Sequence, residues 1–156
     1  MQKLNINTDL IDAMSVDAIR CYPNEACGFL LGKLEDQREA VSFHACKNIQ
    51  DELHAQDAER YPRTAATAYV MDPKDQKQVE SLAKDKGLDI VAIVHSHPDH
   101  EAYFSAEDKG NAAPWGEPLF EGLSYVVVSV YDKKIKEIKD FFWSDESKDF
   151  VESVII

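Results

Sequence analysis

Apolar residues recur with two different periods along this chain, and the pattern predicts a mixture of helices and strands. After Thr8 they recur at helical spacing, and Asp72 followed by Pro73 is typical of a helix start that Gly87 would end. The residue before a proline disfavours helical backbone, so the first helix should end before Pro23. The predicted helices cover residues 8–22, 72–87 and 105–111.

Short apolar runs between polar segments predict strands. The run over residues 126–128 is apolar without alternation, which suits a strand covered on both faces. A polar turn over residues 35–38 joins the first two strands and indicates an antiparallel hairpin. The order helix, strand, strand, helix, strand, helix, strand, strand predicts an α/β fold with a mixed sheet and helices packed against it. The predicted strands cover residues 26–32, 40–46, 88–94, 123–131 and 135–143.

Length and composition narrow the class of protein. The 156 residues, 44% hydrophobic and 29% charged, suit one globular domain over residues 1–156. No apolar run is long enough to cross a bilayer and the amino terminus lacks a signal-peptide apolar region, so we expect a cytoplasmic protein without a membrane partner. The net charge of −12 argues against nucleic acid as a partner, because phosphate binding needs a basic surface.

Two histidines close together indicate the chemistry of the chain. His95 and His97 follow an apolar run, and because side chains alternate along a strand both should project to the same side. Asp108 could fold back to add an oxygen. Two imidazoles and one carboxylate leave one tetrahedral position of Zn²⁺ open, as in catalytic rather than structural sites. Each residue taken alone could instead be an ordinary surface or helix-start residue.

Hydrolysis at such an ion also needs a base, and Glu25 is the best candidate. It stands just before the apolar run at residues 26–31, where loss of hydration would raise its pKa toward neutral pH. Ser105 has two interpretations. With Asp108 three residues later it is typical of a helix capping box, and its hydroxyl could also stabilise an oxyanion. Spacing alone favours the cap, and the two roles are compatible.

Together these residues resemble a known motif. They are Glu25, the run His95-Ser96-His97-Pro98, Ser105 and Asp108. Their order and spacing are similar to the JAMM motif of the MPN (Mov34/PAD-1) zinc metalloprotease family, Glu … His-x-His-Pro-x(6)-Ser-x-x-Asp. The similarity extends over about residues 4–143, and the chain resembles the stand-alone prokaryotic members.

The resemblance implies a fold and residue roles. It implies an α/β sandwich like that of the cytidine deaminases, with one catalytic Zn²⁺ bound by His95, His97 and Asp108. Glu25 would be the general acid and base, and Ser105 would support the tetrahedral intermediate. The deaminase signature H-x-E with P-C-x-x-C is absent from the sequence.

The resemblance also implies a substrate class. The expected activity is that of a metallo-isopeptidase or peptidase, which hydrolyses the amide bond after the C-terminal glycines of a ubiquitin-like or sulfur-carrier protein adduct. Two alternatives are a non-catalytic scaffold that binds ubiquitin-like proteins and a zinc hydrolase of small-molecule amides. The intact set of motif residues argues against the scaffold.

The way in which the substrate would bind is a further hypothesis. A glycine-rich tail could lie along an exposed strand edge and gain main-chain hydrogen bonds. The long polar stretch 48–67 and the loop 98–104 are expected to form the walls of its channel. Of the residues in that loop, His100 is expected to face solvent rather than to be a fourth ligand. Tyr103 and Phe104 either line the channel or pack beneath the loop.

Overall fold

A computed structural model describes residues 3–34 and 38–155. Seven strands within these ranges form one sheet. The strand order is β1-β3-β2-β4-β5-β6-β7, and β1 also pairs with β7, so that the sheet closes on itself. The pairs β1–β3, β1–β7 and β4–β5 are parallel and the rest antiparallel, which confirms the predicted mixed sheet. The strands are β1 (Lys3–Asn5), β2 (Cys27–Lys33), β3 (Arg38–Cys46), β4 (Asp89–Pro98), β5 (Ser124–Tyr131), β6 (Lys134–Ser144) and β7 (Asp149–Ile155).

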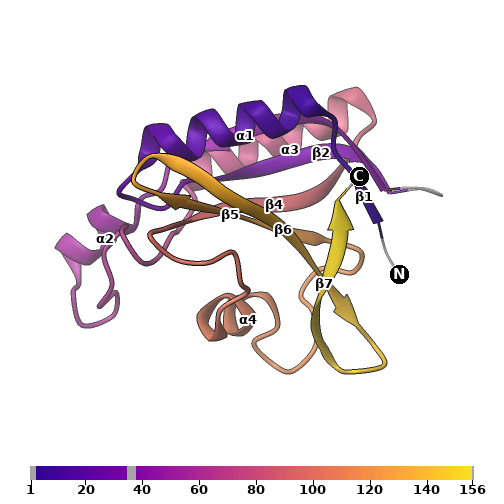
Figure 1. Cartoon of the computed structure of the whole chain (residues 1–156). Coiled ribbons are helices and arrows are strands. Elements are labelled where there is room, and N and C mark those ends of the chain that lie inside the picture. The colour runs from indigo at the N-terminus through magenta and orange to yellow at the C-terminus, as the bar shows by residue number, and fades with distance from the viewer. Residues whose placement is uncertain (1–2, 35–37, 156) are drawn as a thin grey trace.

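The sheet closes through short pairings of β1 with β3 and β7. Figure 1 shows the two ends of the chain at the same end of the molecule, where β1 lies beside β7. Each of the seven described strands therefore has a neighbour on both sides. β1 pairs with β3 only at residues 38 and 39 and with β7 only at residues 154 and 155, so the rest of the outer edges of β3 and β7 has no strand partner among the described residues. The addition of a substrate tail along an exposed strand edge stays a prediction.

The helices cover both faces of the sheet. Met14 in α1 is buried in one cluster with Leu30, whereas Val79 in α3 is buried in another cluster with Phe29 and Leu31. Since successive residues of a strand face opposite sides, α1 and α3 lie on opposite faces of β2. The helices are α1 (Thr8–Cys21), α2 (Gln50–Gln56), α3 (Pro73–Lys86) and α4 (Ala106–Ala112).

The signals at the ends of the predicted helices are confirmed. Asp72 caps α3 by accepting a hydrogen bond from the backbone of Lys74, and Gly87 ends the helix with a φ of 64°. A left-handed backbone of this kind favours glycine, which has no Cβ to clash. The first helix ends at Cys21, before Pro23 as expected, and no helix of the described residues is long and apolar enough to cross a membrane.

The predicted strands are present, with some differences. β4 does not stop at residue 94 but continues to Pro98, because its parallel pairing with β5 extends to Val130. β1, β7 and α2 were not predicted; α2 lies within the stretch 48–67, which was expected to be only a connection. Of the predicted hairpin turn at residues 35–38, positions 35–37 lie outside the described residues.

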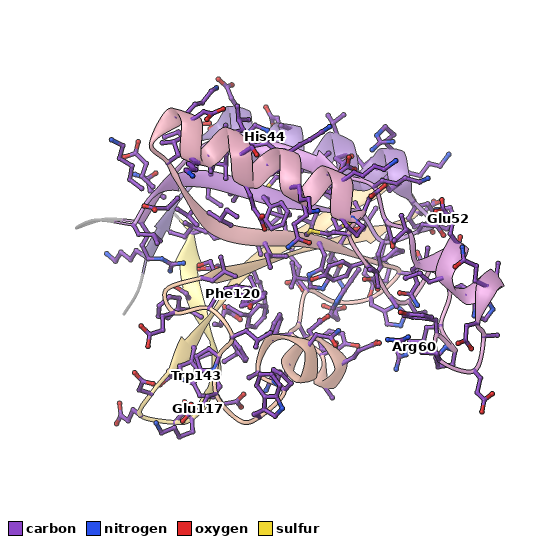
Figure 2. All side chains as sticks on the ribbon, turned by 180° about the vertical axis from the view of Figure 1, so that it is seen from behind. His44, Glu52, Arg60, Glu117, Phe120 and Trp143 are labelled. Atoms are coloured by element: carbon purple, nitrogen blue, oxygen red, sulfur yellow. The ribbon has the colours of Figure 1, made fainter. Side chains whose placement is uncertain are left out.

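Charged side chains surround the outside of the molecule. Figure 2 shows Glu52 in α2, Arg60 close to that helix, and Glu117 in a distant part of the surface. All three are exposed, as expected for an acidic chain whose charge stays in water. The buried residues next to the sheet are mainly aliphatic and aromatic.

A close backbone contact between β2 and β3 gives a stability prediction. A Cβ at Gly32 would lie 1.8 Å from the carbonyl oxygen of Glu39, at the point where the strand register shifts. We expect Gly32→Ala to lower the free energy of unfolding, measured in urea, by at least about 1–3 kcal/mol. The matched control is Gly110→Ala in α4, where nothing lies within 4 Å and alanine should be neutral or stabilising by about 0.5–1 kcal/mol. Equal effects of the two variants would contradict the close packing of β2 on β3.

Candidate metal centre

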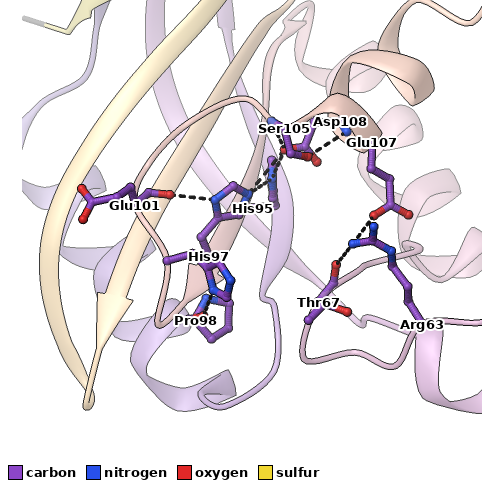
Figure 3. A network of polar contacts seen from close by, with 10 residues as sticks. Arg63, Thr67, His95, His97, Pro98, Glu101, Ser105, Glu107 and Asp108 are labelled. Carbon is purple, nitrogen blue, oxygen red and sulfur yellow. Dashed lines mark hydrogen bonds and ion pairs between the residues drawn. The ribbon is translucent and has the colours of Figure 1, made fainter.

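Three predicted ligands meet at the end of β4 (Figure 3). His95 and His97 project from the same side of the strand, and their Nε2 atoms are 3.2 Å apart. Asp108 comes from α4, and its Oδ2 lies 3.3 Å from His95 Nε2 and 3.4 Å from His97 Nε2. Both histidines are buried, so these nitrogen atoms face one another and a carboxylate rather than bulk water. The three residues form a group that could hold a metal ion.

The start of α4 orients the carboxylate of Asp108. Ser105 is the N-cap of the helix: its Oγ accepts the N–H of Asp108 at 3.0 Å, and Asp108 Oδ2 accepts the N–H of Ser105 at 3.0 Å. This reciprocal pair confirms the predicted capping box. It also holds Oδ2, the oxygen that faces the histidines, at a defined position.

A backbone carbonyl orients His97. Its Nδ1 lies 2.9 Å from the carbonyl oxygen of Glu101, so we assign the ring proton to Nδ1. The lone pair of Nε2 then points toward His95 and Asp108. Metal-binding histidines are commonly fixed in this way by an acceptor on the other ring nitrogen.

Glu25 is placed next to the group by the strand that carries the histidines. Ser96, between them, accepts the N–H of Ala26 on its Oγ at 2.7 Å and donates its own N–H to the carbonyl of Ala26 at 3.0 Å. Glu25 is buried, and it lines the same cavity as His97 and Asp108. The structure thus brings all five predicted site residues together.

Asn48 is a residue of the site that the sequence did not reveal. Its Nδ2 donates to the carbonyls of Glu25 at 3.0 Å and Ala68 at 3.2 Å, and its Oδ1 accepts the backbone N–H groups of Gln50 and Val70. It therefore ties the backbone of Glu25 to that of Ala68, which lines the same cavity. The only signal in the sequence was a polar residue shortly after a strand, which is too common to single it out.

Burial and neighbouring charges shift the pKa values of two carboxyl groups. Burial, reinforced by the negative charges of Asp108 and Glu107, raises the pKa of Glu25 to about 9, while Arg63 opposes this shift. Burial also favours the neutral form of Asp108, but the polar contacts of its Oδ2 with the two imidazoles outweigh burial in the metal-free site and hold the pKa of Asp108 well below its ordinary range. In the metal-free site, Glu25 therefore favours its protonated form and Asp108 its ionised form.

The cavity beside the group is small and polar. Its volume is about 100 Å³. An ion pair of 2.9 Å between Arg63 and Glu107 joins the segment before α3 to α4 (Figure 3). The ring of Tyr69 stacks on His95 with centroids 4.8 Å apart, and that of Tyr103 packs edge-on against His97 at 5.0 Å. The aromatic rings restrict how the two imidazoles can turn.

The loop after β4 divides its residues between the site and the core. His100 is exposed, as expected, and its Nδ1 lies 2.9 Å from the carbonyl of Pro98. Tyr103 is half-exposed beside the cavity, whereas Phe104 is buried against Tyr125, Phe141 and Phe150. Tyr103 therefore lies where it could line a channel, whereas Phe104 packs beneath the loop, because successive side chains of the loop face opposite ways.

Comparison with known proteins identifies the family. Residues 7–145 match the family described as prokaryotic homologs of the JAB domain. The chain belongs to this family. Its resemblance to JAMM/MPN proteins and its predicted α/β sandwich are therefore confirmed, and the JAB domain fills most of the chain.

Relatives and solved structures are in agreement. This JAB-family chain is 33% identical to the CysO-cysteine peptidase of Mycobacterium tuberculosis over 138 residues, 88% of this chain and 81% of that protein. It is 31% identical to the desampylase of Haloferax volcanii over 107 residues, 69% of this chain and 63% of that protein. A solution structure from Desulfitobacterium hafniense has a TM-score of 0.73 at 26% identity and covers 100% of this chain and 92% of its own. One from Salinibacter ruber has a TM-score of 0.66 at 31% identity, with coverage of 100% and 90%.

Proposed function

We propose that this JAB-family protein is a zinc-dependent peptidase or isopeptidase. Its substrate would be the amide bond after the C-terminal glycines of a ubiquitin-like or sulfur-carrier protein adduct. The names of the relatives, a CysO-cysteine peptidase and a desampylase, support hydrolysis and this class of substrate. His95, His97 and Asp108 would bind the zinc, and Glu25 and Ser105 would act on the substrate.

The spacing of the three donor atoms carries the proposal. Donors around a tetrahedral ion are separated by about 1.63 bond lengths, and bonds of about 2.0–2.1 Å to Zn²⁺ place them about 3.3–3.4 Å apart. The observed separations are 3.2, 3.3 and 3.4 Å. The three atoms therefore fit one face of a tetrahedron, with the fourth corner free for substrate or water. Nitrogen and carboxylate donors also suit zinc, whereas magnesium and calcium favour oxygen.

The residues of the chain then have defined tasks. When bound, zinc would supply Lewis acidity and lower the pKa of a coordinated water toward 7. Glu25 would accept the proton of the attacking water and deliver it to the leaving amine, and its raised pKa suits a group that must hold this proton between the steps. Ser105 Oγ accepts a bond from Asp108, so its own hydroxyl proton is available to the carbonyl oxygen as this gains negative charge.

A substrate panel together with a metal analysis tests this function. The purified protein should contain about one zinc ion per chain by elemental analysis. It should cleave a carrier protein whose terminal Gly-Gly is joined by an amide bond to cysteine or to a lysine side chain, and a chelator should abolish cleavage. Tight binding of the carrier without cleavage would favour a scaffold instead. Cleavage of short acyl amides alone would favour a small-molecule hydrolase.

A further inference from the structure

Three polar residues form a row across neighbouring strands beside the metal centre. His97 of β4 is paired in register with Ser129 of β5, and Ser129 is paired with Glu137 of β6. Side chains at paired positions project from the same face of a sheet, so Ser129 and Glu137 lie on the face that carries the candidate metal centre. Ser129 is fully buried and interrupts a run that is otherwise valine over residues 126–130. A buried hydroxyl is costly unless it forms a hydrogen bond, so a serine at this position needs a partner.

The loop after β4 folds over this row and supplies the partners. Residues 100, 101 and 102 each use one main-chain group to contact one member of the row. These contacts are Ser129 Oγ donating to the carbonyl of His100, His97 Nδ1 with the carbonyl of Glu101 at 2.9 Å, and Glu137 Oε1 accepting the N–H of Ala102 at 3.1 Å. The middle contact orients the ring of His97, and the outer two fix the main chain on either side of it.

The other contacts of Glu137 and of the loop do not account for this arrangement. Glu137 Oε2 is 3.9 Å from Lys139 Nζ, which is beyond hydrogen-bond distance. The side chain of Glu101 pairs with Lys136 at the surface, where ion pairs contribute little to stability. Ala102 is only 1% exposed, so its N–H depends on an acceptor from the protein, and Glu137 provides it.

We propose that Ser129 and Glu137 are positioning residues, which hold the loop so that the carbonyl of Glu101 fixes the ring of His97. A ring that is already fixed loses less conformational freedom when it binds an ion, so metal affinity should be higher. Partners on the second ring nitrogen of metal-binding histidines typically change metal affinity by about 10–100-fold. The inference rests on the metal role proposed above for His97.

The same two contacts also set one wall of the cavity. The carbonyl of Glu101 accepts the N–H of Tyr103 at 3.0 Å as well as meeting His97. The ring of Tyr103 packs edge-on against His97 at 5.0 Å between centroids and lines the cavity. Release of the loop should therefore loosen the contact between these two rings, which can be measured without a metal.

Variants at Glu137 test the proposal and include a rescue by the conservative change. Glu137→Gln keeps an oxygen that can accept the N–H of Ala102, whereas Glu137→Leu is of similar size and cannot accept. Lys136→Gln and Lys139→Gln are matched controls on the same strand. Zinc affinity is measured by competition with a chromophoric chelator. We expect Glu137→Leu and Ser129→Ala to weaken zinc binding by about 10-fold, and Glu137→Gln and both controls to stay close to the wild type.

A second measurement keeps this proposal separate from the proposed function. In the metal-free protein, NMR should show slow exchange of the Ala102 amide and a nuclear Overhauser contact between the rings of His97 and Tyr103. Both should be lost in Glu137→Leu and kept in Glu137→Gln. An equal loss of zinc affinity in these two variants would overturn the proposal, as would an intact ring contact in folded Glu137→Leu. If the wild-type chain bound no zinc, the proposed function would fail, and the ring contact would still decide whether Glu137 positions His97.

Discussion

Replacing Glu25 with glutamine is expected to lower kcat by about 10²–10⁴-fold while the zinc stays bound. Glutamine has nearly the same shape, so the strand contacts around Ala26 should persist, but an amide cannot take up and return a proton. Glu25 is also absent from the group of three possible metal ligands, so metal content should not change. The measurement combines steady-state kinetics on a carrier adduct with elemental analysis of the same sample.

Glu107→Gln is the matched control for this variant. Glu107 is an exposed carboxylate that lines the same cavity, and it pairs with Arg63 rather than with the substrate site. We expect its kcat to stay within a few-fold of the wild type. Full activity of Glu25→Gln, or an equal loss in both variants, would remove Glu25 from the mechanism.

The pH profile gives a second readout of Glu25. A base must be ionised to act, so activity should rise with pH through the pKa of Glu25. Burial raises that pKa to about 9 in the metal-free site, and a bound divalent cation nearby will lower it. Glu25→Gln should abolish this rising limb in whatever activity remains. A limb unchanged in the variant would assign the titration to another group.

His97→Ala is expected to abolish zinc retention. The change removes one of three donors and also the ring that Glu101 holds in place. Without it, two donors remain, which is fewer than zinc sites in proteins use. After dialysis, elemental analysis should find about one zinc per wild-type chain and almost none in the variant. Added zinc should raise the melting temperature of the wild type only, because an ion that binds the folded state stabilises it.

His100→Ala is the matched control for the ligand variant. His100 lines the same cavity, but it is exposed and its Nδ1 faces the carbonyl of Pro98. This variant should retain its zinc and its thermal response to the ion. Full occupancy in His97→Ala would contradict the ligand assignment, and loss in both variants would indicate a general disturbance of the loop.

Some features could be predicted because they depend only on neighbours in the chain. The cap at Asp72 and the end at Gly87 are set by backbone geometry within a few residues. The common side of His95 and His97 follows from alternation along one strand. The capping box of Ser105 and Asp108 spans four residues. Such local rules hold whatever the rest of the fold does.

Other features could not be predicted because their partners lie far apart in the chain. Asn48 makes its bonds across about twenty residues on each side, and nothing near it in the sequence marks it as a hub. β4 extends past His97 only because β5 is beside it. β7 closes the sheet by pairing with β1, from the opposite end of the chain. Pairing over such distances is decided by the packing of the whole sheet.

The sequence by itself determined the α/β class and singled out the three residues that could hold a metal ion, since both follow from short-range patterns and residue chemistry. Only the tertiary structure placed the donor atoms of His95, His97 and Asp108 at the separations of a tetrahedral face. It also set Glu25 into the wall of the same cavity. These residues come from three separate segments, and only a packed core holds such segments at fixed positions.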